Sequence, residues 1–363
     1  MKTLLSTILL LALLLLGGEA VKAQSTADSS DANLVALPIV FLTPETSWGF
    51  GAASVYTFRL AGEPRSTRPS QLQLGGAYTL ENQILLYLPF QLFWQEEAYN
   101  TYGEVGYYRY TYFYYGIGNS FESYEGELFD LAYPRVRLNL AYKAVGEWYL
   151  GLRYWLDNMR VSNTAQEGLL ESNRPTGIEG GLLSGVGPLA LLDQRDNVFY
   201  PTEGNYLEAG VLYNGSALGS DFDFTKFTVD ARKYWSKEDS EAVLALNAYL
   251  EFNTGQPPFT HLAMVGGTRL MRGYYQGRYR DRQMGILQGA YRFPIVWRFK
   301  GTVFGALGNV AGRIADFRLD NTRYALGVGL RFLLLEDEKA HVRLDYGFGQ
   351  GTSGFYLTVG EAF

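Results

Sequence analysis

Apolar and polar residues alternate along most of the chain with the period of two that is typical of β-strands. From Tyr324 to Leu334, every even-numbered residue is Tyr, Leu, Val or Phe, and the positions between them include two Gly and Arg331. The same alternation recurs in residues 84–94 and 342–348. A tilted strand of about ten residues is long enough to cross the hydrocarbon core of a membrane. The pattern predicts strands with one face toward lipid and the other toward a polar lumen.

Segments of this kind occur roughly 16 times, an even number that is typical of single-chain outer-membrane barrels. They lie near residues 35–43, 48–60, 70–80, 82–94, 99–114, 126–142, 147–161, 178–192, 204–213, 221–235, 241–253, 283–297, 301–311, 322–334, 340–349 and 353–363. Stacked soluble β-sandwiches are the alternative, but 28 Tyr and 6 Trp suit the aromatic girdles of a membrane barrel better. We therefore predict an all-β fold, a 16-stranded antiparallel transmembrane β-barrel over residues 35–363, closed between its first and last strands.

The connectors of this barrel differ greatly in length. With both ends of the barrel chain in the periplasm, most extracellular connectors are short, whereas the sixth extends from Thr254 to Arg282. A loop of that length in an otherwise short-looped barrel usually has a function. It is also basic, with Arg269, Arg278 and Arg280 in addition to Arg282. It either contacts solvent and anionic lipopolysaccharide, or folds toward the lumen and pairs with acidic barrel residues; the fold we predict has the second arrangement.

The first residues resemble a targeting segment rather than part of the fold. Lys2 precedes an apolar run from Ile8 to Leu16, and Val21 and Ala23 supply small or apolar residues at positions −3 and −1 of a cleavage site after Ala23. This pattern predicts a signal peptide over residues 1–23, because the apolar run is too short to span a membrane. Residues 24–34 are small and polar and predict a short disordered periplasmic lead. We expect an integral protein of the outer membrane of a Gram-negative bacterium, in contact with outer-membrane lipids and lipopolysaccharide.

Composition leaves little room for catalytic or metal chemistry. The chain has no Cys and two His, and its 31 basic and 37 acidic residues argue against a nucleic-acid partner. Neither His261 nor His341 has a Ser partner at strand spacing, and residues 351–354 are one residue short of a G-x-S-x-G elbow. We therefore predict no catalytic residues, no metal site and no cofactor, and a protein that is not an enzyme.

The tip of the long loop reads Met271-Arg272-Gly273-Tyr274. It resembles the aliphatic-Arg-Gly-aromatic tip of the sixth extracellular loop in the bacterial surface antigen family, whose barrels include the outer-membrane protein assembly factors of the BamA and TamA type. In this family the arginine is a latch inside the lumen. The predicted strand count places the loop between strands eleven and twelve, where the sixth extracellular loop of a 16-stranded barrel belongs.

Two further segments resemble the same family. The stretch 192–204 is similar to a periplasmic turn found in the middle of these barrels, with Asp193, Arg195, Asp196 and Gly204 at its characteristic positions. These charged residues favour capping of the turn by local hydrogen bonds over chemistry. Residues 290–294 and the terminal Phe363 are similar to the closing strands, and a C-terminal aromatic is the usual signal for outer-membrane insertion in such proteins.

Two departures change what the resemblance implies. The family places carboxylates that hold the loop arginine at positions occupied here by Ala290 and Ala306. A buried Arg272 without an anion would be destabilising, so it should find another carboxylate or stay in water. The lumen-facing candidates are Asp345, Glu251, Glu208 and Asp157. The second departure is that the short lead leaves no room for the periplasmic POTRA modules of the relatives.

The resemblance implies a factor that aids insertion or translocation of outer-membrane or surface proteins through a lateral seam. Unfolded outer-membrane proteins would be its clients, and a periplasmic or lipoprotein partner would replace the missing arm. The alternative is a small-solute pore or a structural barrel subunit of an outer-membrane complex. For the pore, the cationic lining would consist of Arg135, Arg137, Arg153, Arg331 and Arg343.

Overall fold

The computed structural model describes residues 32–43, 47–119, 126–237, 240–336 and 339–363. The predicted signal peptide over residues 1–23 lies outside these ranges, as does most of the predicted lead at 24–34. The first strand begins at Asn33, within the last residues assigned to that lead.

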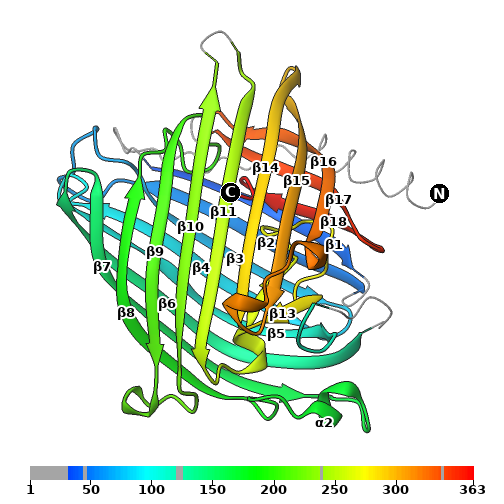
Figure 1. Cartoon of the computed structure of the whole chain (residues 1–363). Helices are drawn as coiled ribbons and strands as arrows, with labels where there is room; N and C mark the ends of the chain where they lie inside the picture. The colour runs from blue at the N-terminus through cyan, green and yellow to red at the C-terminus, as the bar shows by residue number, and fades with distance from the viewer. Residues whose placement is uncertain (1–31, 44–46, 120–125, 238–239, 337–338) are drawn as a thin grey trace.

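One antiparallel sheet of 16 strands forms the wall of the molecule, and each strand pairs with its neighbour in sequence once the sixth loop is passed over (Figure 1). The strands are β1 (Asn33–Thr43), β2 (Ser47–Phe58), β3 (Ser70–Thr79), β4 (Ile84–Trp94), β5 (Tyr99–Tyr114), β6 (Glu127–Val145), β7 (Trp148–Ser162), β8 (Gly181–Asp193), β9 (Gly204–Asn214), β10 (Phe224–Ser236), β11 (Val243–Gly255), β14 (Gln283–Val296), β15 (Phe299–Ala311), β16 (Arg323–Leu335), β17 (Ala340–Gly349) and β18 (Thr352–Val359). The predicted fold class is confirmed.

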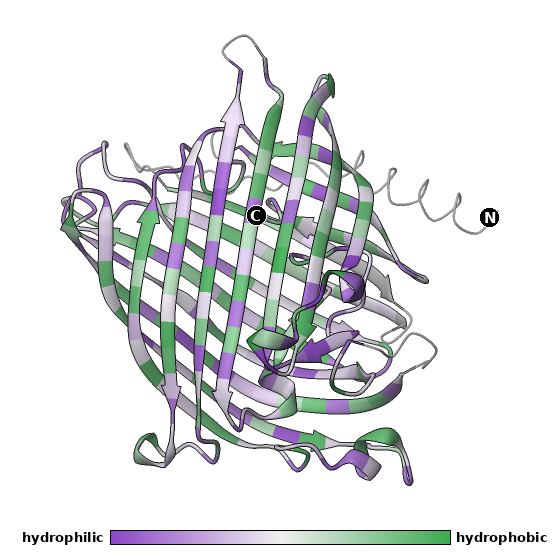
Figure 2. Ribbon diagram, in the orientation of Figure 1, coloured by the Kyte–Doolittle hydropathy of each residue, from purple (hydrophilic) through white to green (hydrophobic). Residues whose placement is uncertain are grey.

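Alternate residues of each strand face opposite environments, as the period of two requires. In β16, Leu326 and Val328 are 61% and 55% exposed, whereas Ala325 and Arg331 are buried. Figure 2 shows the same alternation as hydrophobic and hydrophilic bands along neighbouring strands. The outer surface is therefore suited to lipid, and the charged groups collect in the interior.

The sixth extracellular loop, between β11 and β14, folds into the lumen. It contains a 3₁₀ turn, η2 (Phe259–His261), and a two-stranded sheet of β12 (Ala263–Val265) and β13 (Tyr279–Asp281). Its apolar residues share one buried cluster with residues of β14, β15 and β16. The predicted inward fold of this loop is confirmed.

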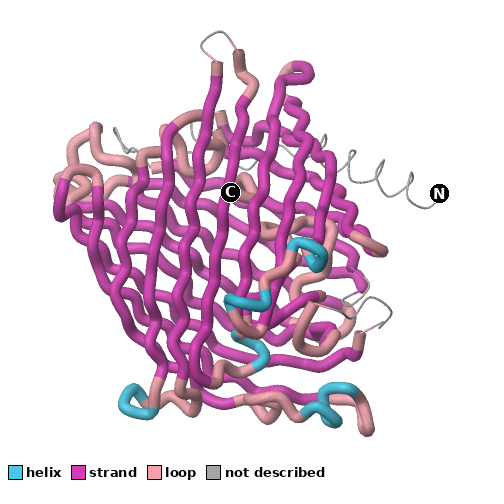
Figure 3. Tube along the Cα trace, viewed as in Figure 1, coloured by secondary structure: helices cyan, strands magenta, loops and turns pink. Residues whose placement is uncertain are grey.

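Helical segments are few and short (Figure 3). Among the described residues, the longest is α2 (Leu169–Asn173), between β7 and β8. The others there are the 3₁₀ turns η1 (Ser216–Leu218), η3 (Ile314–Asp316) and η4 (Leu319–Asn321), besides η2. Within the described ranges, none is long and apolar enough to cross a membrane.

The two ends of the sheet differ from the prediction. The sequence pattern extends the last strand to Phe363, but β18 ends at Val359, because Gly360 adopts a φ of +79° and turns the chain away from the wall. The predicted closure is not seen as a ladder either, since no pairing joins β1 to β18 over their described residues.

Candidate functional site

The tip of the sixth loop is buried against the inner wall of the barrel. The side chain of Arg272 is 2% exposed, and its guanidinium forms an ion pair with Asp345 of β17. It also lies over the ring of Phe304 of β15, 3.6 Å from the ring centre. A buried cation needs both an anion and close packing to offset its loss of hydration, and this site supplies both.

Backbone contacts fasten the same tip to the last three strands. The Gly273 N–H donates to the Tyr356 hydroxyl of β18 at 2.9 Å, and that hydroxyl donates to the Tyr274 carbonyl at 3.1 Å. The Tyr274 hydroxyl donates to the Tyr324 carbonyl of β16 at 2.8 Å. A Cβ on Gly273 would lie 2.7 Å from the backbone of Phe348, so only glycine permits this approach.

Asp345 is the centre of a larger charge network. Its carboxylate is fully buried and accepts from Arg331 at 2.5 Å and lies 3.5 Å from the Nε of Arg343, in addition to pairing with Arg272. Arg331 in turn donates to Glu361 at 3.0 Å. Burial would raise the pKa of Glu361, but the guanidinium groups of Arg292 and Arg331 outweigh burial and hold it below its usual range.

The other three predicted latch partners have different partners of their own. Glu251 pairs with Lys226, and Glu208 pairs with Arg153 at 2.6 Å. Asp157 lies among Arg137, Arg135 and His261. It belongs to β7, which is not a neighbour of the strands β16–β18 that contact the loop tip. Of the four carboxylates, the structure brings only Asp345 to Arg272.

The two alanines that replace the family carboxylates are both buried and face the lumen. Ala306 packs in the cluster that contains Met271 and Tyr274, and Ala290 packs in a second cluster that contains Phe363. Their small side chains therefore leave space that the loop tip and the C-terminal segment fill. Glu361 was missed by sequence reasoning, which placed it within the last strand; Gly360 before it was the available signal for a turn.

A second arginine holds the sixth loop to the opposite part of the wall. Arg280 is buried and donates to the Phe113 carbonyl at 3.1 Å, and its guanidinium lies 5.3 Å from the ring centre of Tyr114. Its carbonyl accepts from the Gly118 N–H at 2.8 Å. Arg269 is 63% exposed, so the basic residues of the loop serve both as lumen anchors and as a solvated face.

The histidines lie in buried settings rather than in an accessible triad. The ring of His261 contacts Asp157 at 2.7 Å and the hydroxyl of Thr260 at 3.1 Å, two partners that sequence spacing did not show. Burial lowers the pKa of His261, and the hydrogen bond to Asp157 only partly opposes this effect. The neutral ring thus anchors η2 to the wall. Over the described ranges, no group of three or more His, Asp or Glu could hold a metal ion.

The turn between β8 and β9 is closed by its own side chains. Arg195 donates twice to Asp193, at 2.7 and 2.8 Å. The carboxylate of Asp196 accepts from the backbone and hydroxyl of Thr202, at 2.8 and 2.7 Å. Gly204 has a φ of +104°, and a Cβ there would lie 2.1 Å from a backbone carbonyl. These groups act as local caps of the turn.

Gly204→Ala is expected to destabilise the barrel by about 1–3 kcal/mol, because the chain must either leave its positive-φ conformation or displace the facing backbone of Gln194. Denaturant unfolding in detergent micelles measures this loss. Gly219→Ala is the matched control, since Gly219 also has positive φ but a Cβ added there would meet no atom within 4 Å. Equal losses in both variants would show that backbone strain alone, and not the close packing of this turn, is responsible.

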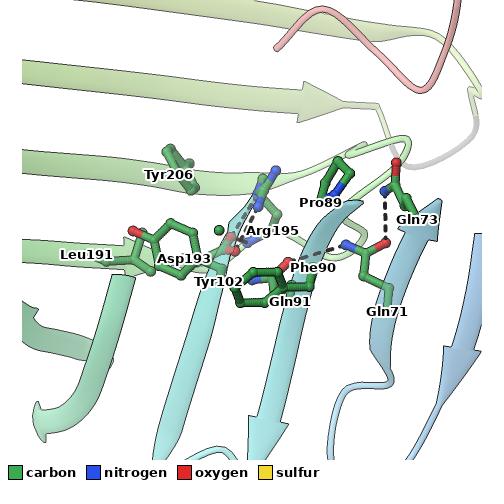
Figure 4. A pocket seen from close by; sticks show the side chains of 11 residues that line it. Gln71, Gln73, Pro89, Phe90, Gln91, Tyr102, Leu191, Asp193, Arg195 and Tyr206 are labelled. Carbon is green, nitrogen blue, oxygen red and sulfur yellow. Dashed lines mark hydrogen bonds and ion pairs between the residues drawn. The ribbon is translucent and has the colours of Figure 1, made fainter. Parts of the chain in front are cut away.

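Beside this turn the inner wall is hollowed, with a mixed polar and apolar lining. A recess of about 190 Å³ lies between β3–β5 and β8–β9 (Figure 4). Gln71 and Gln91 on one side share a hydrogen bond of 3.4 Å, and the Asp193–Arg195 pair lies on the other. The described residues that line the recess offer hydrogen-bonding groups and no metal-ligand or nucleophilic arrangement.

Comparison with known proteins identifies the same architecture. The family model of the Omp85 superfamily domain matches residues 69–363. BamA from Haemophilus ducreyi lacking POTRA domains 1–3 superposes with a TM-score of 0.55 at 13% identity, over 94% of this chain and 73% of that one. CdiB from Acinetobacter baumannii gives 0.56 at 11% identity over 90% of this chain, and CdiB from Escherichia coli gives 0.54 at 12% over 92%.

The chain spans 59% and 62% of the two CdiB chains, which is less than two thirds of their length. At these identities the likeness shows the fold alone. A search of curated proteins gave no significant match.

Proposed function

Because the chain belongs to the Omp85 superfamily, we propose that it aids the insertion or translocation of outer-membrane or surface proteins through a lateral seam between β1 and β18. In this proposal the sixth loop is a latch without covalent chemistry. The latch holds the seam strands in place until a client engages them.

The attachment of the loop tip to the strands beside the seam carries this proposal. The tip contacts β18 through Tyr356 and pairs with Asp345 on the neighbouring β17. β18 is eight residues long and its described residues pair only with β17. A short strand with one paired edge offers an unpaired backbone edge to another strand. Movement of the tip would therefore change the contacts that hold β18, the strand at this edge.

We expect unfolded outer-membrane proteins to be the clients, since their strands can pair with an exposed edge. A periplasmic or lipoprotein partner would deliver them to the barrel. Outer-membrane lipid and lipopolysaccharide would surround the apolar outer face. Embedding in the outer membrane of a Gram-negative bacterium is part of the same proposal.

The pore alternative is less well supported by the interior. The arginines considered as a cationic lining are all engaged: Arg135 and Arg137 with Asp157, Arg153 with Glu208, and Arg331 and Arg343 with Asp345. Arg153, Arg331 and Arg343 are also buried, and Arg135 and Arg137 are partly buried, so these paired guanidinium groups do not provide a hydrated cationic path. The folded-in loop further occupies the lumen.

Reconstitution tests the proposal. Purified protein in liposomes is expected to accelerate the folding of a urea-unfolded eight-stranded outer-membrane barrel by about tenfold or more over empty liposomes, equivalent to about 1.4 kcal/mol of the barrier. The folded client is read on gels as a band whose mobility changes on heating. Planar-bilayer recordings on the same sample give the contrary outcome: steady large conductance without acceleration would support a pore and contradict an assembly role.

A further inference from the structure

The segment after β18 returns into the lumen instead of continuing along the wall. The Gly360 N–H donates to the His341 carbonyl at 2.9 Å, which fixes the turn. Of the next three residues, Ala362 and Phe363 are buried, and the side chain of Glu361 is 3% exposed. Figure 1 places this end of the chain within the outline of the barrel. These three residues are called the tail below.

The tail occupies a site with a charged half and an apolar half. In the charged half, the Glu361 carboxylate accepts two hydrogen bonds of 3.0 Å from Arg331 and lies 3.6 Å from Arg292. Arg292 also donates to the Phe363 carbonyl at 2.9 Å. Ala362 and Phe363 complete a buried apolar cluster, whose other members are Tyr234, Ala245, Ala290 and Phe304. The carboxylate of Glu361 therefore lies among cationic groups, and Ala362 and the ring of Phe363 lie among apolar ones.

Two of the groups that hold the tail also hold the loop latch. Arg331 bridges Glu361 to Asp345, the carboxylate that pairs with Arg272. Phe304 belongs to the apolar cluster of the tail, and its ring also lies beneath the guanidinium of Arg272. Each buried arginine depends on the carboxylates around it, because an unpaired charge in this setting is strongly unfavourable. Loss of the tail would therefore leave Arg331 with Asp345 alone and expose one side of Phe304.

We propose that the tail is a tethered peptide ligand: a lumen site built around Arg292 and Arg331 binds an acidic–small–aromatic segment, and its occupancy is coupled to the loop latch through Arg331, Asp345 and Phe304. Release of the tail loosens the latch, and release of the latch loosens the tail, as coupling between two sites must be reciprocal. The segment also anchors the end of β18, so its release frees a strand at the edge of the sheet. The inference goes beyond the proposed function, since it concerns this barrel without any client.

The absence of Cys from the chain permits a direct test in the full-length protein. Ala362→Cys places one thiol on the tail, and its reaction with a maleimide in detergent micelles reports how often the tail leaves its site. Glu203→Cys, at an exposed position of the neighbouring turn, gives the rate for a free thiol. We expect Ala362→Cys to react at least about tenfold more slowly than Glu203→Cys, because labelling proceeds only from opened molecules.

Coupling is tested by adding Arg272→Ala to the Ala362→Cys protein. Labelling is expected to accelerate by about tenfold or more, whereas Arg153→Ala, which removes another buried arginine of the lumen, leaves the rate within about twofold. Labelling of Ala362→Cys as fast as Glu203→Cys would overturn the bound tail. Equal acceleration by Arg272→Ala and Arg153→Ala, or by neither, would overturn the coupling.

The coupling is also measured in the other direction, by changing the tail and observing the loop tip. This measurement does not depend on the folding of the cysteine variant. Glu361→Gln, in a chain without added thiols, is expected to increase tryptic cleavage after Arg272, with Glu208→Gln as the matched control in the same lumen. Mass spectrometry of the fragments identifies the cut. Unchanged cleavage in Glu361→Gln would contradict the coupling. Since no client is present, failure here would leave the proposed assembly activity untouched, and failure of that activity would leave this result standing.

Discussion

Asp345→Asn is expected to destabilise the barrel by about 3–5 kcal/mol, the usual effect of removing one partner from a buried ion pair. The carboxylate is fully buried and faces Arg272, Arg331 and Arg343, so its neutralisation leaves three guanidinium groups with only Glu361 among them. The sixth loop loses its ion pair at the same time. Denaturant unfolding in micelles, followed by the heat-dependent gel shift, measures the loss.

Glu208→Gln is the control for this change. It also removes a lumen carboxylate, but Glu208 is partly exposed and pairs with one arginine, Arg153. We expect a smaller loss, of about 1–2 kcal/mol, because the amide oxygen of Gln can still accept a hydrogen bond from Arg153 and because one guanidinium is affected rather than three. Equal losses in the two variants would show that Asp345 is an ordinary lumen carboxylate and would remove it from the centre of the network.

Gly273→Ala is expected to displace the loop tip from the wall and to destabilise the barrel by about 1–3 kcal/mol, as overpacking in a close-packed interior does. The added methyl would meet the Phe348 backbone at 2.7 Å, and the φ of +119° is one that side chains rarely adopt. Cleavage by trypsin after Arg272 should rise as the tip becomes accessible. The cut is quantified by mass spectrometry against the intact protein.

Gly267→Ala separates steric contact from backbone strain in the same loop. Gly267 has a φ of +95°, but the nearest neighbour to an added Cβ is the Cβ of Gln276 at 3.4 Å, an ordinary van der Waals distance. We expect this variant to keep the tip protected from trypsin. Protection of the tip in Gly273→Ala as well would contradict the close approach of the tip to β17.

Much of the barrel wall could be predicted from the sequence because side chains alternate between the two faces of a β-strand. The period of two assigns every residue to lipid or lumen, so Asp345 and Arg331 could be placed inside before their partners were known. The turn residues Asp193 and Gly204 were also recognisable, because their hydrogen bonds and backbone angles are local. The tip could be located by its place in the longest loop.

Contacts between side chains across the lumen could not be predicted from the sequence, for a physical reason. Alternation gives the face of a residue but not its height or angle around the barrel, so four carboxylates were equal candidates for Arg272. The contact of His261 with Asp157 joins residues that are 104 positions apart. The alternation of β18 continues to Val359, and the chain turns inward at Gly360. The packing of Phe363 beside Ala290 depends on this turn, which the alternation does not show.

A reversible lock on the seam tests the central claim most directly. Ala36→Cys on β1 is combined with single cysteines placed in turn along β18 from Ser353 to Thr358, in a chain otherwise free of thiols. A disulfide forms only where the two Cα atoms approach to within about 7 Å, so the scan identifies the pair that closes. In the liposome assay, the best-crosslinking pair is expected to stop accelerated folding of the unfolded barrel when oxidised and to restore it when reduced. Full acceleration by the crosslinked protein would contradict a lateral seam between β1 and β18.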